Sequence, residues 1–437
     1  MSNGDHFWNY ELGASYYEEI TPVVVTGDQN TAVTDIPFFV SFPNYIVNPG
    51  SVEVDVPGSS HVASVFGSSR FRFTSKLGLE LGVRYTDQYQ NSQQSYLTVR
   101  DAGGAPVCVT ASEPPPCVRL PFLPGDDSSR THAFFTGGAN LTYKVDNDIS
   151  TYLSWGHSFR PGVAAVGATT PISPNVLLAN SETSDSFELG LKGYFFERRL
   201  SANVDIFHQN FYGYIGHTAD SISADLPGST SPSPTASGLA LNFNGNVSST
   251  GVEASFIAHP IGAWTVGLDL SYVDAHYVNA NEPCNTPDPA HPGQLIYNTP
   301  ADGVSYCTTN GRVAETPDFH LSANTEYDFD SIGDIKPYVR GLLTYQPGFY
   351  STVAHYNYSD LTLVNLYAGL RSDKGWELTA FVKNLFDQQV ITNINDVNGT
   401  ITPFSVTGVQ GEVYNSGYKT ATVSVPREIG VTASYRF

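Results

Sequence analysis

The feature that most constrains the fold is a strict alternation of apolar and polar residues, repeated along the chain. In the final segment, REIGVTASYRF, every second position is apolar: Ile429, Val431, Ala433, Tyr435 and Phe437. A period of two residues is typical of a β-strand with one apolar and one polar face. Helical periodicity is missing throughout, so the sequence predicts an all-β fold.

About 14 segments show this period, and LGLELGVRY, RLSANVDIF, FHLSANTEY and WELTAFVK show it most clearly. The predicted strands lie near residues 7–19, 60–74, 77–97, 130–145, 149–160, 181–197, 199–216, 239–259, 264–278, 313–329, 335–345, 360–371, 376–390 and 420–437.

The connections between these segments alternate strictly between short and long. Short ones lie near 75 and at 145–148, 197–199, 259–263, 331–334 and 372–375, and the long ones are rich in Pro, Ser, Asn and Gly. This predicts an antiparallel up-and-down transmembrane β-barrel with short periplasmic turns and long extracellular loops. A β-sandwich or a propeller is disfavoured, because no blade-length repeat is present and the strands are longer than usual.

Composition agrees with a surface that does not all face water. Only 14% of the residues are charged, against about 25% in soluble domains, while 13% are aromatic. No run of about 18 apolar residues exists that would form a transmembrane helix. The net charge of -21 excludes a nucleic-acid-binding role, which requires a basic surface. We therefore expect lipid against one face and a polar lumen against the other.

Several stretches resemble the barrel of TonB-dependent outer-membrane receptors. They include SFELGLKGYFFERRLSANVDIFHQNFYGYI (186–215), STGVEASF (249–256), FVKNLFDQ (381–388) and PREIGVTASYRF (426–437). FGSSRFRFTSKLGLELGVRYTD (66–87) and WGHSFRPG (155–162) are similar to further strands of these barrels. The resemblance implies residence in the outer membrane of a Gram-negative bacterium. It also implies uptake of a scarce, bulky solute such as a ferric siderophore, a corrinoid or a glycan.

Receptors of this family close a 22-stranded barrel with an N-terminal plug, and a TonB box engages the energy-transducing partner. This sequence shows no signal peptide, TonB box or plug, so we expect residues 1–437 to be the C-terminal part of the barrel. TonB would then act only through the missing plug. The other expected partners are outer-membrane lipid, the barrel assembly machinery and the solute.

Two alternatives remain open for such a chain. Unpaired strand edges inside hydrocarbon are costly, so WNYELGASYY at the start could pair with the last strand and close a smaller, plugless barrel. That barrel would be a passive pore. The chain could also be a truncated remnant without function.

Ten charged residues occupy the predicted lumen face. One interpretation is docking of the plug or attraction of an anionic solute; the other is a ladder of charge pairs with carboxylates such as Glu377, each worth at most about 1 kcal/mol. The ten are Glu80, Arg84, Glu188, Lys192, Asp205, Asp269, Glu326, Arg340, Lys383 and Arg436.

The four cysteines form two local pairs, Cys108 with Cys117 and Cys284 with Cys307. Two disulfides in an oxidising compartment are the favoured interpretation, and four free thiols are the alternative. The surrounding residues lack metal-site spacing.

No catalytic signature is present: GxSxG, HExxH and a phosphate-binding loop are all missing, and we expect neither enzymatic activity nor a cofactor. Recognition is instead expected in the long loops. Aromatic residues there could stack on a chelate or sugar ring, or could belong to the interfacial girdle. They are Tyr297, Tyr306, Phe349, Tyr350, Tyr356 and Tyr358.

Overall fold

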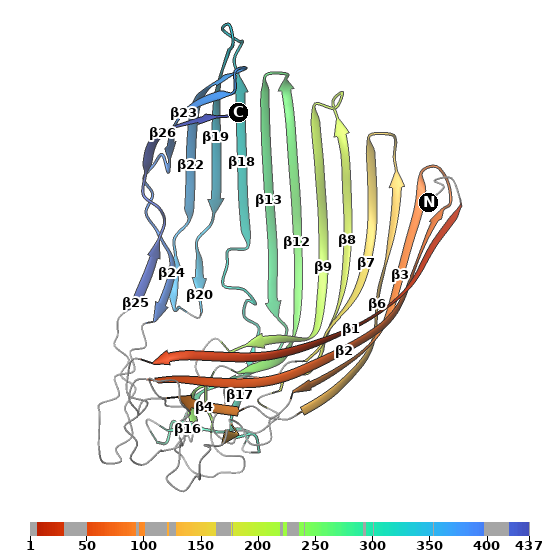
Figure 1. Ribbon diagram of the computed structural model, residues 1–437, viewed down its shortest axis with the longest axis vertical. Coiled ribbons are helices and arrows are strands. Elements are labelled where there is room, and N and C mark those ends of the chain that lie inside the picture. The colour runs from red at the N-terminus through yellow and green to blue at the C-terminus, as the bar shows by residue number, and fades with distance from the viewer. Residues whose placement is uncertain are drawn as a thin grey trace.

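The protein is built around one large, curved, antiparallel β-sheet (Figure 1). The computed structural model describes residues 7–29, 50–92, 96–100, 120–121, 128–162, 176, 178–218, 222–224, 236–239, 241–291, 294–299, 301–352, 354–396 and 419–436.

Within these residues the sheet has 16 strands, and without the short β4 (Tyr96–Arg100) and β5 (Leu120–Pro121) it is a meander of 14. This agrees with the strand number expected from the sequence. In spatial order the 14 are β1 (Trp8–Gln29), β2 (Gly50–Arg72), β3 (Leu77–Ser92), β6 (Ser128–Lys144), β7 (Ile149–Arg160), β8 (Glu182–Phe195), β9 (Leu200–His217), β12 (Asn242–Ile261), β13 (Trp264–Tyr277), β18 (Phe319–Asp328), β19 (Ile335–Gln346), β22 (Leu361–Ser372), β23 (Trp376–Lys383) and β26 (Glu428–Tyr435).

Several predicted strand bounds differ from the structure. The first strand extends to Gln29 and the second begins at Gly50, whereas the segment predicted at 77–97 ends at Ser92 and the one predicted at 313–329 begins only at Phe319. The segment predicted at 376–390 stops at Lys383, because Asn384 and Asp387 adopt positive φ angles of 48° and 52°. The Asn384 amide group fixes this break: its Nδ2 donates to the carbonyl oxygens of Gln388 and Val425, both at 2.9 Å. The segment predicted at 420–437 is likewise two strands, β25 (Lys419–Val423) and β26.

Short hairpins lie at the end of the sheet that carries the long loops (Figure 1). They are β10 (Ile222–Ala224) with β11 (Ala236–Leu239), β14 (Ala280–Cys284) with β17 (Ser305–Thr309), β15 (Thr286–Pro287) with β16 (Leu295–Ile296), β20 (Phe349–Ser351) with β21 (Tyr356–Tyr358), and β24 (Ile391–Asp396) with β25.

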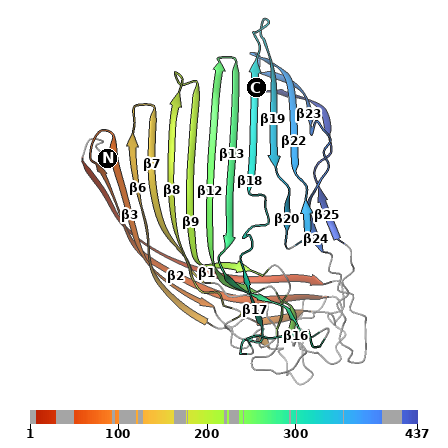
Figure 2. The ribbon, with the colours of Figure 1, turned by 180° about the vertical axis from the view of Figure 1, so that it is seen from behind.

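The first two strands are the longest, and they diverge in direction from the other strands of the sheet. Figures 1 and 2 show β1 and β2 sweeping across the loop end of the neighbouring strands. In the described part of the chain, β1 pairs only with β2, and β26 pairs only with β23. The pairing of the first strand with the last, which would close a smaller barrel, is therefore not formed in this structure.

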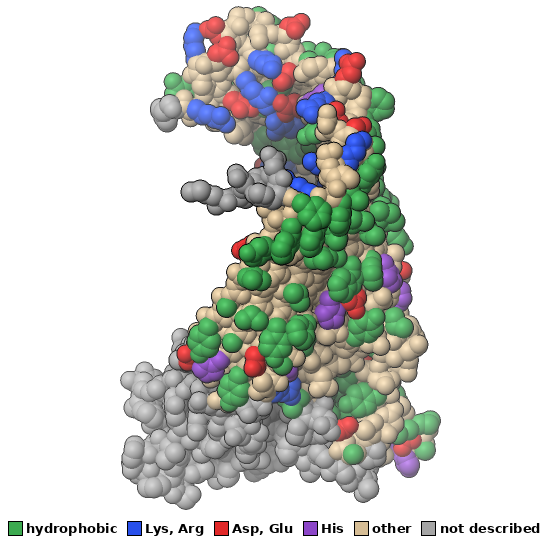
Figure 3. Space-filling view, turned by 90° about the vertical axis from the view of Figure 1, so that its right-hand side faces the viewer, with side chains coloured by type: hydrophobic (Ala, Val, Ile, Leu, Met, Phe, Trp, Pro, Cys, Tyr) green, Lys and Arg blue, Asp and Glu red, His purple; other side chains and the backbone are tan. Residues whose placement is uncertain are grey.

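The two faces of the sheet differ sharply in chemistry. Paired residues of antiparallel strands lie on one face, so the register assigns Leu81, Leu153, Leu189 and Val431 to a common apolar face. Figure 3 shows hydrophobic side chains over the middle of the visible wall, with histidines and acidic side chains among them nearer the loop end. Apolar side chains in such numbers on an open surface are typical of contact with lipid. In the described residues no helix is long and apolar enough to cross a membrane.

Candidate functional site

The opposite face of the sheet carries the charges. Glu326 pairs with Arg340, Lys383 with Glu428, and Asp269 with Ser255, and the same register continues strand by strand across the wall. It puts nine of the ten charged residues singled out from the sequence on this face, which we call the charged wall. The tenth, Arg436, directly follows β26. It lies two positions after Ser434, which pairs with Glu377, and therefore has the phase of the same face.

A dense ion-pair network lies on β18, β19, β22 and β23, near the short turns. Arg371 Nη1 donates to Glu326 Oε1 at 2.7 Å, and Arg340 Nε donates to Glu326 Oε2 at 2.5 Å. The Arg371 guanidinium also lies 3.8 Å from the ring centroid of Tyr338, whose hydroxyl donates to Glu377 at 2.8 Å. The positive side chains of this region are thus engaged within the wall itself.

The other end of the charged wall uses hydroxyl groups as well as carboxylates. Arg70 Nη2 donates to Glu80 Oε2 at 3.0 Å, as expected for a ladder of charge pairs. Arg84 instead donates to the Ser64 hydroxyl at 2.5 Å and to the Ser15 hydroxyl at 3.1 Å. The expected pairing of Arg84 with a neighbouring carboxylate is therefore replaced by hydrogen bonds to serines of β1 and β2.

The middle of the charged wall is dominated by carboxylates. Asp205 pairs in register with Glu253, and like charges directly opposite each other are unfavourable. Glu188 accepts a hydrogen bond from Tyr152, and Lys192 Nζ lies 5.0 Å from the centroid of the Tyr152 ring.

The charge-pair ladder therefore does not extend through this acidic stretch, which consists of Glu188, Asp205, Glu253 and Asp269. One Arg ion pair, Arg160 with Glu182 at 2.9 Å, joins β7 and β8 near the long loops. The ion pairs of Arg70, Arg340, Arg371 and Lys383 lie on strands to either side of the stretch.

At the loop end, three long connections pack around a common apolar core, which we call the loop block. Its buried members are Val176 from the β7–β8 connection, Ile222, Ala224 and Leu241 from the β9–β12 connection, and Val304 from the β13–β18 connection. Val304 is 0% exposed and Leu241 is 1% exposed. Tyr306 packs against this core. The loop block is therefore a small folded unit with an interior of its own.

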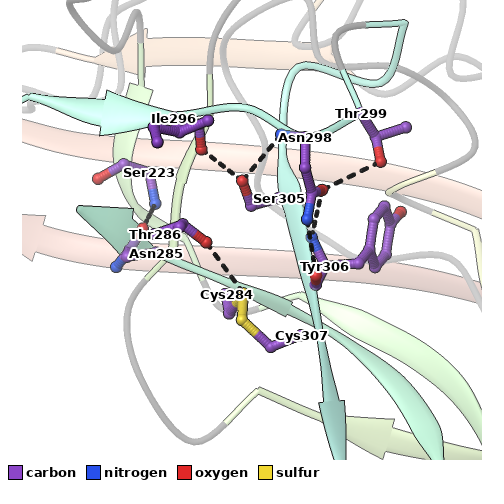
Figure 4. Close-up of a disulfide and its surroundings, with 10 residues drawn as sticks. All are labelled: Ser223, Cys284, Asn285, Thr286, Ile296, Asn298, Thr299, Ser305, Tyr306 and Cys307. Carbon is purple, nitrogen blue, oxygen red and sulfur yellow. Dashed lines mark hydrogen bonds between the residues drawn. A yellow bond between two sulfur atoms is a disulfide. The ribbon is translucent and has the colours of Figure 1, made fainter. Parts of the chain in front are cut away.

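A disulfide and polar contacts hold the loop block together (Figure 4). Cys284 and Cys307 are bonded, with their Cα atoms 5.8 Å apart, so the second of the two expected disulfides is confirmed. Asn285 Oδ1 accepts a hydrogen bond from the backbone N–H of Ser223 at 2.9 Å, which links the β13–β18 connection to the β9–β12 connection. Cys108 and Cys117 lie outside the described residues.

The six loop aromatics separate into two groups. Tyr297 and Tyr306 belong to the β13–β18 connection, where burial raises the pKa of the Tyr306 phenol above its ordinary value and the Asp302 carboxylate raises it further. The other four lie on the β20–β21 hairpin. There Phe349 and Tyr358 stack with ring centroids 5.0 Å apart, while Tyr350 points outward and is 49% exposed.

A polar cluster on the apolar face was missed from the sequence. His157 Nδ1 lies 2.9 Å from Asp185 Oδ1, and the indole N–H of Trp155 donates to the same oxygen at 3.3 Å. His208 lies beside it, with Nδ1 2.8 Å from Thr250 Oγ1. The sequence signal was a carboxylate at an apolar-phase position, in SDSFELGL, where Asp185 alternates with Phe187 and Leu189.

The described residues hold no candidate metal centre. Groups of three or more His, Cys, Asp or Glu side chains arranged to hold a metal ion are not found among them. What the arrangement offers is a wall with one lipid-facing and one charged surface, capped at one end by folded loops.

Comparison with known proteins decides the family. The model of the TonB-dependent receptor-like β-barrel matches residues 2–385. The chain belongs to the TonB-dependent receptor β-barrel family. Members of this family are transport receptors of the Gram-negative outer membrane and not enzymes, as expected from the sequence.

Solved structures share the fold. The ferric yersiniabactin uptake receptor FyuA from Yersinia pestis aligns with a TM-score of 0.56 and 11% identity, over 98% of this chain and 55% of that receptor. The ferric-catecholate import receptor Fiu from E. coli K12 aligns with a TM-score of 0.57 and 15% identity, over 98% of this chain and 52% of Fiu. The siderophore receptor PiuA from Acinetobacter baumannii aligns with a TM-score of 0.56 and 16% identity, over 99% of this chain and 53% of PiuA.

A curated relative matches a shorter stretch. The ferric-pyoverdine 358 receptor from Pseudomonas putida is 27% identical over 174 residues, which cover 39% of this chain and 18% of that receptor. The chain thus spans about half the length of the solved receptors and a smaller share of this relative.

Proposed function

We propose that this chain forms the C-terminal part of the barrel of a receptor that imports a bulky, scarce solute, with a ferric siderophore as the first candidate. Residues 1–437 are, in this proposal, barrel only. The support is the family match together with relatives that are themselves named for ferric yersiniabactin, ferric catecholates and ferric pyoverdine.

The observation that carries the proposal is the distribution of charge on the charged wall. Its arginines on β19 and β22 are held by Glu326 and Glu377, whereas the acidic stretch is not balanced in the same way. A plug domain with basic side chains would complement the acidic stretch, and TonB would act through that plug. Attraction of an anionic solute by the wall is the weaker interpretation, because Arg340 and Arg371 are already paired with carboxylates of the wall.

Solute recognition is assigned to the loop end. The loop block presents a preformed surface, and Tyr350 on the β20–β21 hairpin offers an exposed aromatic ring at the same end of the sheet. Aromatic rings stack well on planar chelates and on sugars. A corrinoid and a glycan therefore stay as alternative solutes to be separated by experiment.

The test is uptake by cells from which the gene has been deleted. Radioactive iron is supplied on catecholate, hydroxamate and pyoverdine-type siderophores, and the deletion strain should fail to import iron from one of these classes. Returning the gene should restore that import, and removing TonB from the complemented cells should abolish it. Tyr350→Ala should lower that uptake, while Tyr212→Ala, a substitution of another exposed tyrosine on the wall, should not.

If the deletion strain takes up every ferric siderophore normally but loses uptake of a corrinoid or a glycan, that compound replaces the ferric siderophore as the proposed solute. Transport that persists without TonB, together with steady ion conductance of the purified protein in planar bilayers, would favour the passive pore.

A further inference from the structure

Five aromatic rings on the charged wall lie directly over a glycine of the neighbouring strand. In each case the aromatic residue and the glycine are register partners. A Cβ atom added at any of these glycines would lie less than 3.0 Å from a carbon of the ring, so only glycine leaves room for it. The aromatic–glycine pairs are Phe66 with Gly13, Tyr152 with Gly190, Phe207 with Gly251, Tyr338 with Gly369, and Phe381 with Gly430.

All five aromatic–glycine pairs join strands that are linked by long connections. The strand pairs are β1 with β2, β7 with β8, β9 with β12, β19 with β22, and β23 with β26. Of the other two long-connected pairs, β13 and β18 place the Asn324 side chain over Gly267, and β3 and β6 pair Gly82 with Gly138. In the described part of the wall, no pair joined by a short turn has a glycine this close to the ring of its register partner.

Strands linked by long connections need some other feature to set their register. A short turn fixes the register of its two strands, whereas a long connection allows one strand to slide along the other. The alternation of apolar and polar residues excludes a slip of one residue, because that slip would turn every side chain to the wrong face. A slip of two residues moves the strand by about 7 Å and keeps both faces, so the alternation does not exclude it.

The aromatic–glycine pairs discriminate against this slip of two residues. In β7 and β8 the slip would put Tyr152 opposite Glu188 or Lys192 instead of Gly190, and either side chain would fill the space of the ring. The same holds at the other four pairs, because every position two residues from a paired glycine is larger than glycine. These positions are Glu11, Ser15, Glu188, Lys192, Ser249, Glu253, Tyr367, Arg371, Glu428 and Thr432.

Four of the five rings also have a cation over them. Arg84 Cζ lies 5.5 Å from the ring centroid of Phe66, Lys192 Nζ lies 5.0 Å from that of Tyr152, Arg371 Cζ lies 3.8 Å from that of Tyr338, and Lys383 Nζ lies 4.8 Å from that of Phe381. The face of an aromatic ring attracts a cation, so these side chains hold their rings in place. In the described part of the chain the exception is Phe207, which lies beside the acidic stretch.

We propose that the aromatic–glycine pairs set the register of strands that no short turn fixes, and that the four cations are positioning residues which keep the rings over the glycines. This gives the lumen cations a role within the wall, separate from any plug or solute. It also fixes the place of the loop block, because the β7–β8 and β9–β12 connections supply Val176, Ile222 and Leu241 to its core. A slip of about 7 Å in either strand pair would separate the strand ends from which these connections begin.

The test measures the register of β7 and β8 by disulfide cross-linking of the whole chain assembled in outer membranes. Ser158 and Ser184 are register partners with their Oγ atoms 2.7 Å apart, so cysteines at these two positions report the native register. Cysteines at Ser158 and Ser186, or at Ser154 and Ser186, report a slip of two residues in one direction or the other. Diagonal neighbours in a sheet lie about 7–8 Å apart, which is too far for a disulfide. After oxidation, mass spectrometry identifies the linked peptides in the folded, heat-modifiable band.

The ring is tested first. The parent should form the native cross-link and neither of the slipped ones. Tyr152→Ala removes the ring from Gly190 and should produce slipped cross-links. Tyr152→Phe keeps the ring and loses only the hydroxyl that donates to Glu188, so it should restore the native cross-link alone.

The matched control is Phe187→Ala on the same strand pair. Phe187 is opposite Trp155 and not a glycine, so its loss should leave the native cross-link alone. The cation is tested with Lys192→Gln, which should produce slipped cross-links in lower yield than Tyr152→Ala, and with Lys192→Arg, which should not produce them.

Gly190→Ala is the second variant for the pair, because its Cβ atom would displace the ring and should also produce slipped cross-links. It decides the question if Tyr152→Ala does not reach the folded band. Exclusively native cross-links in the folded variants of Tyr152 and Gly190 would overturn the role of the aromatic–glycine pair. Slipped cross-links in Phe187→Ala as frequent as in Tyr152→Ala would overturn it too, and a Lys192→Gln variant identical to the parent would overturn the role of the cation.

Discussion

At the residue scale, the phase of a side chain within its strand decides its solvent. Leu189 and Glu188 are neighbours in the sequence, yet Leu189 belongs to the apolar face and is 49% exposed there, while Glu188 accepts a hydrogen bond from Tyr152 on the charged wall. The register places nine of the ten charged residues singled out from the sequence on the charged wall. The same rule failed to draw attention to Asp185, because a single polar residue near the end of an apolar row looks like the start of a loop.

The rule makes a direct prediction for this neighbouring pair. Leu189→Arg places a charge in the middle of the apolar band and should destabilise the folded protein by about 2–4 kcal/mol. Glu188→Gln keeps an acceptor for the Tyr152 hydroxyl, so its effect should stay below about 1 kcal/mol. Urea unfolding in detergent or lipid vesicles measures both. Equal destabilisation by the two substitutions would mean that the faces are assigned the wrong way round.

At the element scale, the wall was predictable from the sequence and the loop end was not. A period of two is readable in the wall strands because most of one face must stay apolar, and the polar cluster around Asp185 interrupts it only near the loop end. The break after Lys383 has no such signal, since it depends on the Asn384 amide reaching carbonyl groups of Gln388 and of the distant Val425. Nor could the loop block be foreseen, because Val176, Leu241 and Val304 come from three separate connections with no periodicity of their own.

The disulfide should stabilise the loop block and leave the wall unaffected. Cys284 and Cys307 are separated by 23 residues in the sequence, and closing a loop of that size stabilises by about 3 kcal/mol. In the Cys284→Ser, Cys307→Ser double variant, hydrogen exchange should accelerate in β14 and β17 but not in β12 or β13. Leu241→Ala is the companion variant: it keeps the disulfide and removes apolar contacts from the same core, so it should accelerate exchange in the same segments. Faster exchange throughout the wall would contradict an independent loop block.

The Tyr306 phenol gives the loop block a defined response to alkali. Burial raises the pKa of this group, so its neutral form is favoured in the folded block. The stabilisation is complete below the ordinary tyrosine pKa of about 10, and it is lost as the pH rises from that value through the raised pKa. Limited proteolysis of the β13–β18 connection should therefore increase in this window. Tyr306→Phe, which cannot ionise, should remove the increase, and an identical pH profile in the variant would exclude this group as its cause.

At the scale of the whole molecule, the two faces and the positions of the tryptophans fix how the wall sits in the bilayer. All four tryptophans of the chain lie on the apolar face. Trp8, Trp264 and Trp376 begin their strands beside the short turns, as an interfacial aromatic girdle requires, whereas Trp155 lies within β7. The position of the membrane follows from these four residues without reference to any solute or partner.

Brominated lipids test this placement. Bromine near the middle of the acyl chain should quench the fluorescence of Trp155 most, and bromine close to the headgroup should quench Trp8, Trp264 and Trp376 most. Variants that keep one tryptophan, with Phe at the other three positions, separate the signals. A Trp155 signal that no lipid quenches would place that residue away from the bilayer, and would overturn the assignment of the apolar face.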